Sequence, residues 1–114
     1  MTPLTQADIE AEIMRLSSEL EDETERYAVL STDAAEAEAD YKYAAAQRHM
    51  LMVDRHPKMP ANQRERLIDS ACDAEYRHYK LSAAKLDATK QALLSLRARL
   101  DATRTLSANV RAQT

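Results

Sequence analysis

Tyrosines interleaved with cationic residues are the side chains of this sequence whose types and spacing best suit ligand chemistry. They lie in two segments, Tyr41 to His49 and Tyr76 to Lys80, and more cations follow around Pro57. Cations neutralise phosphates, and aromatic rings stack on bases, so this combination is typical of non-specific single-strand binding. The candidate nucleic-acid-binding residues are Lys42, Tyr43, Arg48, Arg55, Lys58, Arg64, Tyr76, Arg77 and Lys80.

The tyrosines differ in their positions relative to the apolar pattern. Tyr41 and Tyr79 fall on the apolar rows described below, which favours a core position, whereas Tyr43 and Tyr76 fall off them and are better stacking candidates. The formal net charge of −3 argues against a constitutive high-affinity nucleic-acid binder.

Catalytic and cofactor chemistry has little support in this sequence. Glu75 and His78 have the Glu-x-x-His spacing used in di-iron bundles, but the second copy that such a site needs is absent. A chain without glycine has no glycine-rich phosphate loop, and no Cys/His metal spacing occurs. We therefore expect no enzyme activity, no cofactor and no metal.

Cys72 is the single cysteine of the chain, which excludes an internal disulfide. We interpret it as a small buried residue on a helix. A catalytic thiol would need a histidine and an electropositive pocket, neither of which the sequence places beside it. A lone cysteine suits a reducing compartment, so the sequence predicts a cytoplasmic location, in the host cytoplasm if the chain is encoded by a phage.

Long helices must position these residues, because the chain of 114 residues has no glycine and only three prolines. Without glycine, tight turns and glycine C-caps are disfavoured. Pro57 and Pro60 mark one sharp stop. The sequence predicts an all-α fold and one domain over residues 1–114: a helix over about 5–55, a turn at 56–60 and a helix over about 60–111, forming an antiparallel coiled-coil-like hairpin. Thr5 is expected to cap the first helix together with Asp8.

Apolar residues recur close to every seven positions, which is typical of a coiled-coil seam. The rows of the first helix are Ile13, Leu20, Tyr27, Ala34, Tyr41 and Ile9, Leu16, Leu30, Ala37, Ala44, Leu51; those of the second are Cys72, Tyr79, Leu86, Leu93, Leu100 and Ile68, Thr89, Leu96, Val110. Two helices alone bury a marginal core, so we expect a homo-oligomer or a partner, with oligomerisation through Leu86, Leu93, Leu96 and Leu100. The segment 50–53 is apolar on all sides and predicts a buried or partner-contacting tip.

Charge is distributed unevenly along the chain. Residues 1–40 hold 12 acidic and 2 basic residues, residues 41–80 hold 8 basic and 5 acidic, and residues 81–114 hold 6 basic and 2 acidic. Basic residues recur every seven positions at Lys90, Arg97, Arg104 and Arg111. This stripe has two interpretations, pairing with carboxylates of the first helix or contact with phosphates.

Residues 1–6 and the length of the apolar runs indicate whether a secretory signal or a membrane span is expected. Residues 1–6 lack a basic and an apolar region, so no secretory signal is expected, and no run of about 18 apolar residues predicts a membrane span.

The last third of the chain resembles the end of phage recombination mediators of the UvsY type. The resemblance lies in the helical segments 79–88, 93–102 and 106–111, where an apolar stretch is followed by Leu100-Asp101-Ala102, a basic residue and a last turn ending at Arg111. It implies a protein without catalytic activity that binds single-stranded DNA as a ring-like oligomer. It also implies two partners, a RecA-like recombinase and the single-strand-binding protein that this recombinase displaces.

Two hypotheses for the function follow. The first is a non-enzymatic single-stranded-DNA-binding accessory protein, a recombination mediator that helps to load a RecA-like recombinase. The alternative is a structural or adaptor coiled coil that binds only proteins, such as a phage morphogenesis or host-targeting factor. The first predicts salt-dependent binding to single strands, and the second predicts a partner surface over residues 50–59.

Overall fold

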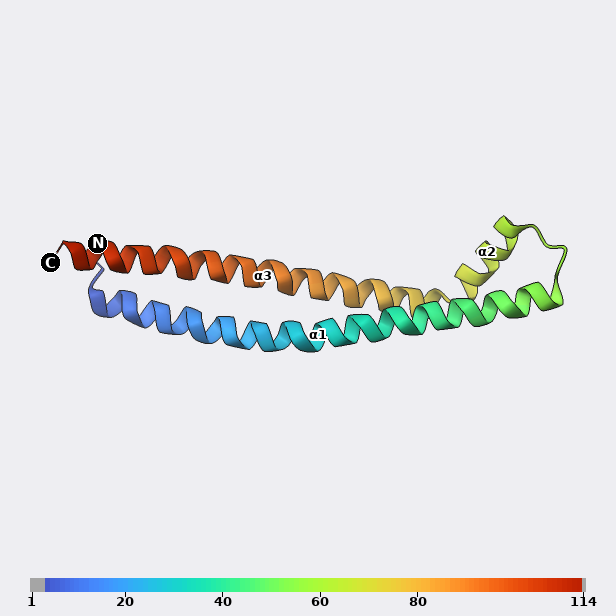
Figure 1. Cartoon of the computed structure of the whole chain (residues 1–114), viewed down its shortest axis with the longest axis horizontal. Coiled ribbons are helices and arrows are strands. Elements are labelled where there is room, and N and C mark those ends of the chain that lie inside the picture. Colours follow the sequence, from blue (N-terminus) through green and yellow to red (C-terminus); the bar gives the residue numbers. More distant parts are fainter. Residues whose placement is uncertain (1–3, 114) are drawn as a thin grey trace. The chain divides into compact units, whose positions relative to one another are not determined.

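The computed structural model describes residues 4–113, and these residues are almost entirely helical. Three helices follow one another, α1 (Gln6–Arg55), α2 (Ala61–Ala71) and α3 (Asp73–Ala112), and no strand occurs among the described residues (Figure 1). The predicted all-α class is therefore confirmed. No described residue has a positive φ, as expected of a chain without glycine.

A reciprocal capping arrangement starts α1. The Thr5 backbone N–H donates to Asp8 Oδ2 at 3.1 Å, and the Asp8 backbone N–H donates to Thr5 Oγ1 at 3.1 Å. The first N–H groups of a helix have no partner within the helix, and this pair of bonds satisfies two backbone donors at its start. The predicted cap is confirmed.

The predicted turn at residues 56–60 separates α1 from α2. The His56 N–H donates to the Met52 carbonyl at 2.9 Å, and the Met59 N–H donates to the His56 carbonyl at 3.1 Å. Pro60 then has φ −57° and ψ 142°, and α2 begins at Ala61. Because proline lacks an N–H, it is well suited to the position just before or at the start of a helix.

The predicted second helix over about 60–111 is divided in two, which corrects the sequence-based boundary. α2 ends at Ala71, and Cys72 has φ −104° and ψ 20°, outside the helical range. The Cys72 N–H still donates to the Ile68 carbonyl, and its own carbonyl accepts from Tyr76, both at 2.9 Å. No glycine or proline marks this position. Ile68 and Cys72 are both buried, so the break coincides with packing of this segment.

The contacts of the chain fall into two compact units, which we call unit 1 and unit 2. Unit 1 comprises the described residues up to Ala28 together with those from Asp87 onward, and unit 2 comprises Val29–Leu86. α1 and α3 each contribute to both units, whereas α2 lies in unit 2.

Unit 1 pairs the start of α1 with the end of α3 in an antiparallel arrangement. Figure 1 shows these segments, blue and red, side by side. Its core is Leu16 packed with Leu96 and Leu100, and Ile13 and Leu20 cover the edge. Leu16 is only 1% exposed. These residues belong to the predicted seam rows, so the heptad pattern located this core correctly.

Unit 2 packs the second half of α1 against α2 and the start of α3. Tyr41 of α1 contacts the rings of Tyr76 and Tyr79 of α3, and Ala37, Ile68 and Cys72 are buried. Ala37, Ile68 and Cys72 also lie on the predicted rows. Alanine lets neighbouring helices approach closely, and this leaves room for the larger tyrosine rings nearby.

Candidate nucleic-acid interface

Three tyrosines of unit 2, which we call the tyrosine cluster, bring two of the predicted segments together. The ring of Tyr41 lies 5.3 Å from that of Tyr76 in an edge-on arrangement and 5.7 Å from that of Tyr79 in a stacked one, and Tyr76 and Tyr79 lie 6.5 Å apart. These distances are in the range of favourable aromatic pairs. Tyr41 and Tyr79 are half-buried, in agreement with their seam positions, whereas Tyr76 is exposed.

Lys80 lies over this cluster. Its Nζ is 5.0 Å from the ring centre of Tyr79 and 5.5 Å from that of Tyr76. A cation at this distance is attracted by the negative face of an aromatic ring. The structure therefore brings Tyr76 and Lys80 together, with the ammonium group directed at the rings of Tyr76 and Tyr79.

Two other predicted phosphate-binding residues are paired with carboxylates of their own helices. Lys42 Nζ lies 2.8 Å from Glu38 Oε1, and Arg77 Nε lies 2.9 Å from Asp73 Oδ2. The hydrogen bond to Glu38 raises the pKa of Lys42, so its charge is retained. Exposed i,i+4 pairs contribute little to stability and exchange readily, so these cations are available to phosphates at a small cost.

Four cations near the turn differ from these, and we call Arg48, Arg55, Lys58 and Arg66 the turn cations. All four are exposed. Among the ion pairs of residues 4–113, none involves a turn cation. Three of them were predicted as phosphate contacts, and Arg66 extends the set.

Arg64 is the predicted phosphate-binding residue whose side chain contacts the turn. Its side chain is half-buried and its Nη2 donates to the Met59 carbonyl at 3.0 Å. Its Nε is buried and has no hydrogen-bond partner within the described residues. The guanidinium thus links α2 to the turn, because the Arg64 side chain extends back from the first turn of α2 to the Met59 carbonyl. The Arg64 side chain therefore supports the turn, and its role as a phosphate contact stays a prediction.

Tyr43 is the most exposed of the predicted stacking residues, at 66%. Its hydroxyl accepts a hydrogen bond from Gln47 Nε2 at 2.9 Å, one turn along α1. The tyrosine cluster does not include it, so the structure presents Tyr43 and Tyr76 as two separate exposed rings. Each exposed ring is available to stack on a base.

The predicted oligomerisation stripe packs inside the chain. Leu93, Leu96 and Leu100 are buried in unit 1. Leu86 is half-buried in unit 2. The start of α1 covers Leu96 and Leu100 within the chain, and the oligomerisation role of the stripe stays a prediction. The sequence showed that this face must be covered but not by what.

An apolar surface remains open at the end of α1. Met50 is 72% exposed, and Leu51 and Val53 are also exposed. With His49 and Asp54 they line a hollow of about 600 Å³. The structure therefore leaves the predicted tip uncovered within the chain.

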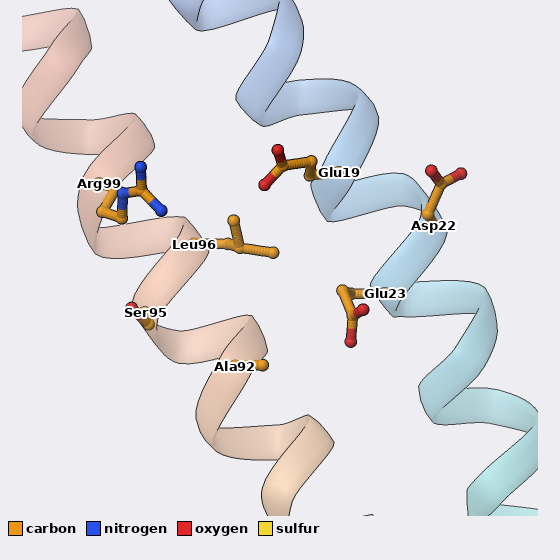
Figure 2. A pocket seen from close by; sticks show the side chains of 7 residues that line it. All are labelled: Glu19, Asp22, Glu23, Ala92, Ser95, Leu96 and Arg99. Carbon is orange, nitrogen blue, oxygen red and sulfur yellow. The ribbon is translucent and has the colours of Figure 1, made fainter.

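In unit 1, carboxylates lie beside Arg104 and Arg111 of the basic stripe. For this stripe the sequence left two interpretations, pairing with carboxylates or contact with phosphates. Arg111 lies 4.0 Å from Glu10 of α1, and Arg104 lies 4.0 Å from Asp101 of its own helix. In Figure 2, Arg99 and Glu19 extend toward each other above Leu96 from opposite helices. The hollow there, about 390 Å³, is also lined by Asp22 and Glu23. A lining with three carboxylates and one guanidinium disfavours a polyanion at this place.

Sequence reasoning missed two aspartates beside the tyrosine cluster. Asp69 of α2 and Asp73 of α3 line a hollow of about 370 Å³ together with Tyr41 and Tyr76. We call this space the tyrosine–aspartate hollow. The signal in the sequence was the four-residue spacing of Asp69, Asp73 and Arg77, which places the three on one helical face.

The Cys72 thiol is free and buried. Burial is the main cause that raises the pKa of the Cys72 thiol, with smaller contributions from Glu75 and Asp69, so the thiol stays protonated. No group of three or more His, Cys, Asp or Glu side chains within residues 4–113 is arranged to hold a metal ion. No helix in this part of the chain has the length and apolar character to cross a membrane.

Comparisons of the chain with protein-family models, with curated proteins and with solved structures give no match. The resemblance to UvsY-type mediators stays an expectation from the sequence.

Proposed function

We propose that this chain is a non-enzymatic accessory protein that binds single-stranded DNA through unit 2. The observation that carries the proposal is the set of turn cations, which are exposed and make no ion pair with the described residues. Cations without a protein partner release counterions from a polyanion without first breaking an internal pair, so their net gain on binding is larger.

Aromatic groups on the same unit supply the second component of single-strand recognition. Tyr43 and Tyr76 expose their rings on α1 and α3, and both belong to unit 2 together with the turn cations. Stacking of a base on such a ring contributes about 1–3 kcal/mol and tolerates any sequence. The proposed interface is therefore sequence-tolerant and salt-dependent.

We infer further that the two units form one domain, an antiparallel hairpin that self-associates. This is supported by the continuity of α1 and α3, each of which contributes to both units, and by the exposed apolar side chains on both helices, such as Val29, Leu81 and Leu106. Following the resemblance, the proposed role is to help a RecA-like recombinase replace single-strand-binding protein, in the cytoplasm that a single cysteine suggests.

The experiment is a fluorescence anisotropy titration of a labelled single-stranded oligonucleotide at several salt concentrations. The variant R48E/R55E/K58E removes three turn cations, and R26E/R97E/R104E makes the same charge change in unit 1. We expect the first variant to lose binding and the second to retain most of it. Single substitutions of a turn cation by Gln should lower the salt slope by about 0.7 each.

Two results would overturn the proposal. Absence of binding by the wild-type chain at low salt would exclude a single-strand binder. Equal losses in the two triple variants would show that only overall charge matters and that unit 2 holds no interface.

The second candidate function, an adaptor that binds only proteins, is favoured by the exposed Met50, Leu51 and Val53. A patch of this kind marks an interaction surface more often than not when it is contiguous. The variant M50S/V53S should then lose self-association or partner binding in light-scattering measurements, while an equally exposed pair in unit 1, M14S/L94S, should not. Loss of self-association without DNA binding by the wild-type chain would favour this candidate.

A further inference from the structure

We propose that the tyrosine–aspartate hollow binds an organic cation, an ammonium or guanidinium group, between the rings of Tyr41 and Tyr76 and the carboxylates of Asp69 and Asp73. All four residues belong to unit 2 and lie on α1, α2 and α3. This proposal is independent of the DNA-binding proposal, although both involve Tyr76.

The walls of the hollow suit a cation with apolar parts. The rings of Tyr41 and Tyr76 meet at 64° with their centres 5.3 Å apart, so they form a corner rather than a flat stack. Aromatic faces attract cations and also cover methylene groups. The volume of about 370 Å³ is at the lower end of the range of about 300–1,000 Å³ for ligand sites.

The hollow carries a net charge of about −1, because one of its two carboxylates has no ion-pair partner among the described residues. Asp73 is paired with Arg77, but Asp69 makes no ion pair with any residue from 4 to 113. Burial raises the pKa of the Tyr41 phenol first, and the Asp69 carboxylate raises it further, so this carboxylate acts on the ring while the phenol stays neutral. One monovalent cation would neutralise the hollow.

One of these two rings, that of Tyr76, already contacts a cation of the chain. Lys80 Nζ lies 5.5 Å from the ring centre of Tyr76, yet Lys80 does not line the hollow. The hollow is therefore not filled by the lysine of its own chain. Two carboxylates repel phosphate, so a nucleic-acid backbone is a poor occupant. A hard metal ion prefers a larger set of oxygen ligands than these side chains offer.

Two sources supply this chemistry, a free small cation or the Lys or Arg side chain of a protein. The experiment titrates the ¹⁵N-labelled full chain with three probes: spermidine, free arginine amide, and an acetylated peptide with one central arginine flanked by alanines. We expect saturable shifts at the amides of Asp69, Asp73 and Tyr76. Tighter binding of the peptide than of the free cations would indicate a protein side chain, and the reverse a small molecule.

Variants locate the site and separate it from the DNA interface. Asp69→Asn should weaken binding about fivefold, and Tyr76→Leu by a similar factor, whereas Tyr76→Phe keeps the ring and should bind as the wild type does. Asp54→Asn makes the same charge change in unit 2 outside the hollow and should have no effect. Asp69→Asn should not weaken single-strand binding, because it removes a negative charge beside Tyr76. Shifts spread over all exposed carboxylates, or equal affinities of Asp69→Asn and Asp54→Asn, would overturn the proposal.

Discussion

Gln6 Nε2 donates a hydrogen bond to Ser107 Oγ at 2.9 Å and so joins two residues that are 101 positions apart in the chain. Ser107 is only 3% exposed. The Gln6 amide also donates to Glu10 Oε1 at 3.2 Å, whereas its Oε1 is buried without a partner. This bond sets the register of α1 against α3 at the open end of unit 1.

Removing this bond should destabilise unit 1 by a modest amount. We expect Ser107→Ala to lower the free energy of unfolding by about 1 kcal/mol, because the half-buried Gln6 amide loses one of its two acceptors. Urea unfolding of Ser107→Ala, Gln6→Ala and the double variant gives the coupling, expected at about 0.5–1.5 kcal/mol. The exposed Ser95→Ala on the same helix is the control. A coupling near zero would show that the bond does not form in solution.

The core of unit 1 should depend strongly on Leu16. This side chain is buried against Leu96 and Leu100, so Leu16→Ala leaves a cavity and should cost about 2–5 kcal/mol in the free energy of unfolding. Leu94 is 50% exposed, and Leu94→Ala should change stability by less than about 0.5 kcal/mol. Thermal unfolding followed by circular dichroism compares the two, and equal effects would contradict the assigned core.

The start of α1 should lose stability in acid. Hydrogen bonds from the backbone and then from the side chain of Thr5 lower the pKa of Asp8 below its ordinary value of 3.8. A carboxyl with a lowered folded-state pKa contributes stability above its unfolded pKa and loses it as the pH falls through the folded-state pKa. Between pH 5 and the region below 3.8, the wild type should therefore lose more stability than Asp8→Asn.

The measurement is urea unfolding of both chains at several acidic pH values. Asp33→Asn, whose carboxyl lies on α1 away from either end, is the control and should follow the wild type. Thr5→Ala should flatten the pH dependence and cost about 1 kcal/mol near neutral pH. An unchanged acid profile in Asp8→Asn would show that the cap contributes nothing to the folded state.

The helices, the cap and the turn could be read from the sequence because each depends on neighbouring residues. A chain without glycine has few alternatives to helix, Thr5 and Asp8 have capping spacing, and Pro57 and Pro60 stop a helix wherever they occur. The seam was also visible, because apolar residues recur every seven positions in each helix, as Ile9 and Leu16 do in α1 and Leu93 and Leu100 do in α3.

Polar members of the seam were harder to foresee. Ser82 and Ser107 are buried and continue the rows, which had been predicted without them, whereas the buried Thr89 was already a member of a predicted row. Composition alone classes a serine as a surface residue. Its burial depends on the helix that packs against it, as Gln6 does against Ser107.

The sequence by itself determined the all-α class, the cap at Thr5 and Asp8 and the turn at Pro57 and Pro60, because helix propensity, capping and proline sterics act over a few residues. It also determined which positions along the helices carry cationic and aromatic residues. Only the tertiary structure decided that Leu16 covers Leu96 and Leu100, that the predicted second helix is interrupted at Cys72, and that Asp69 lies beside Tyr41. Those outcomes depend on which helix faces meet, and a heptad pattern does not state which partner covers its seam.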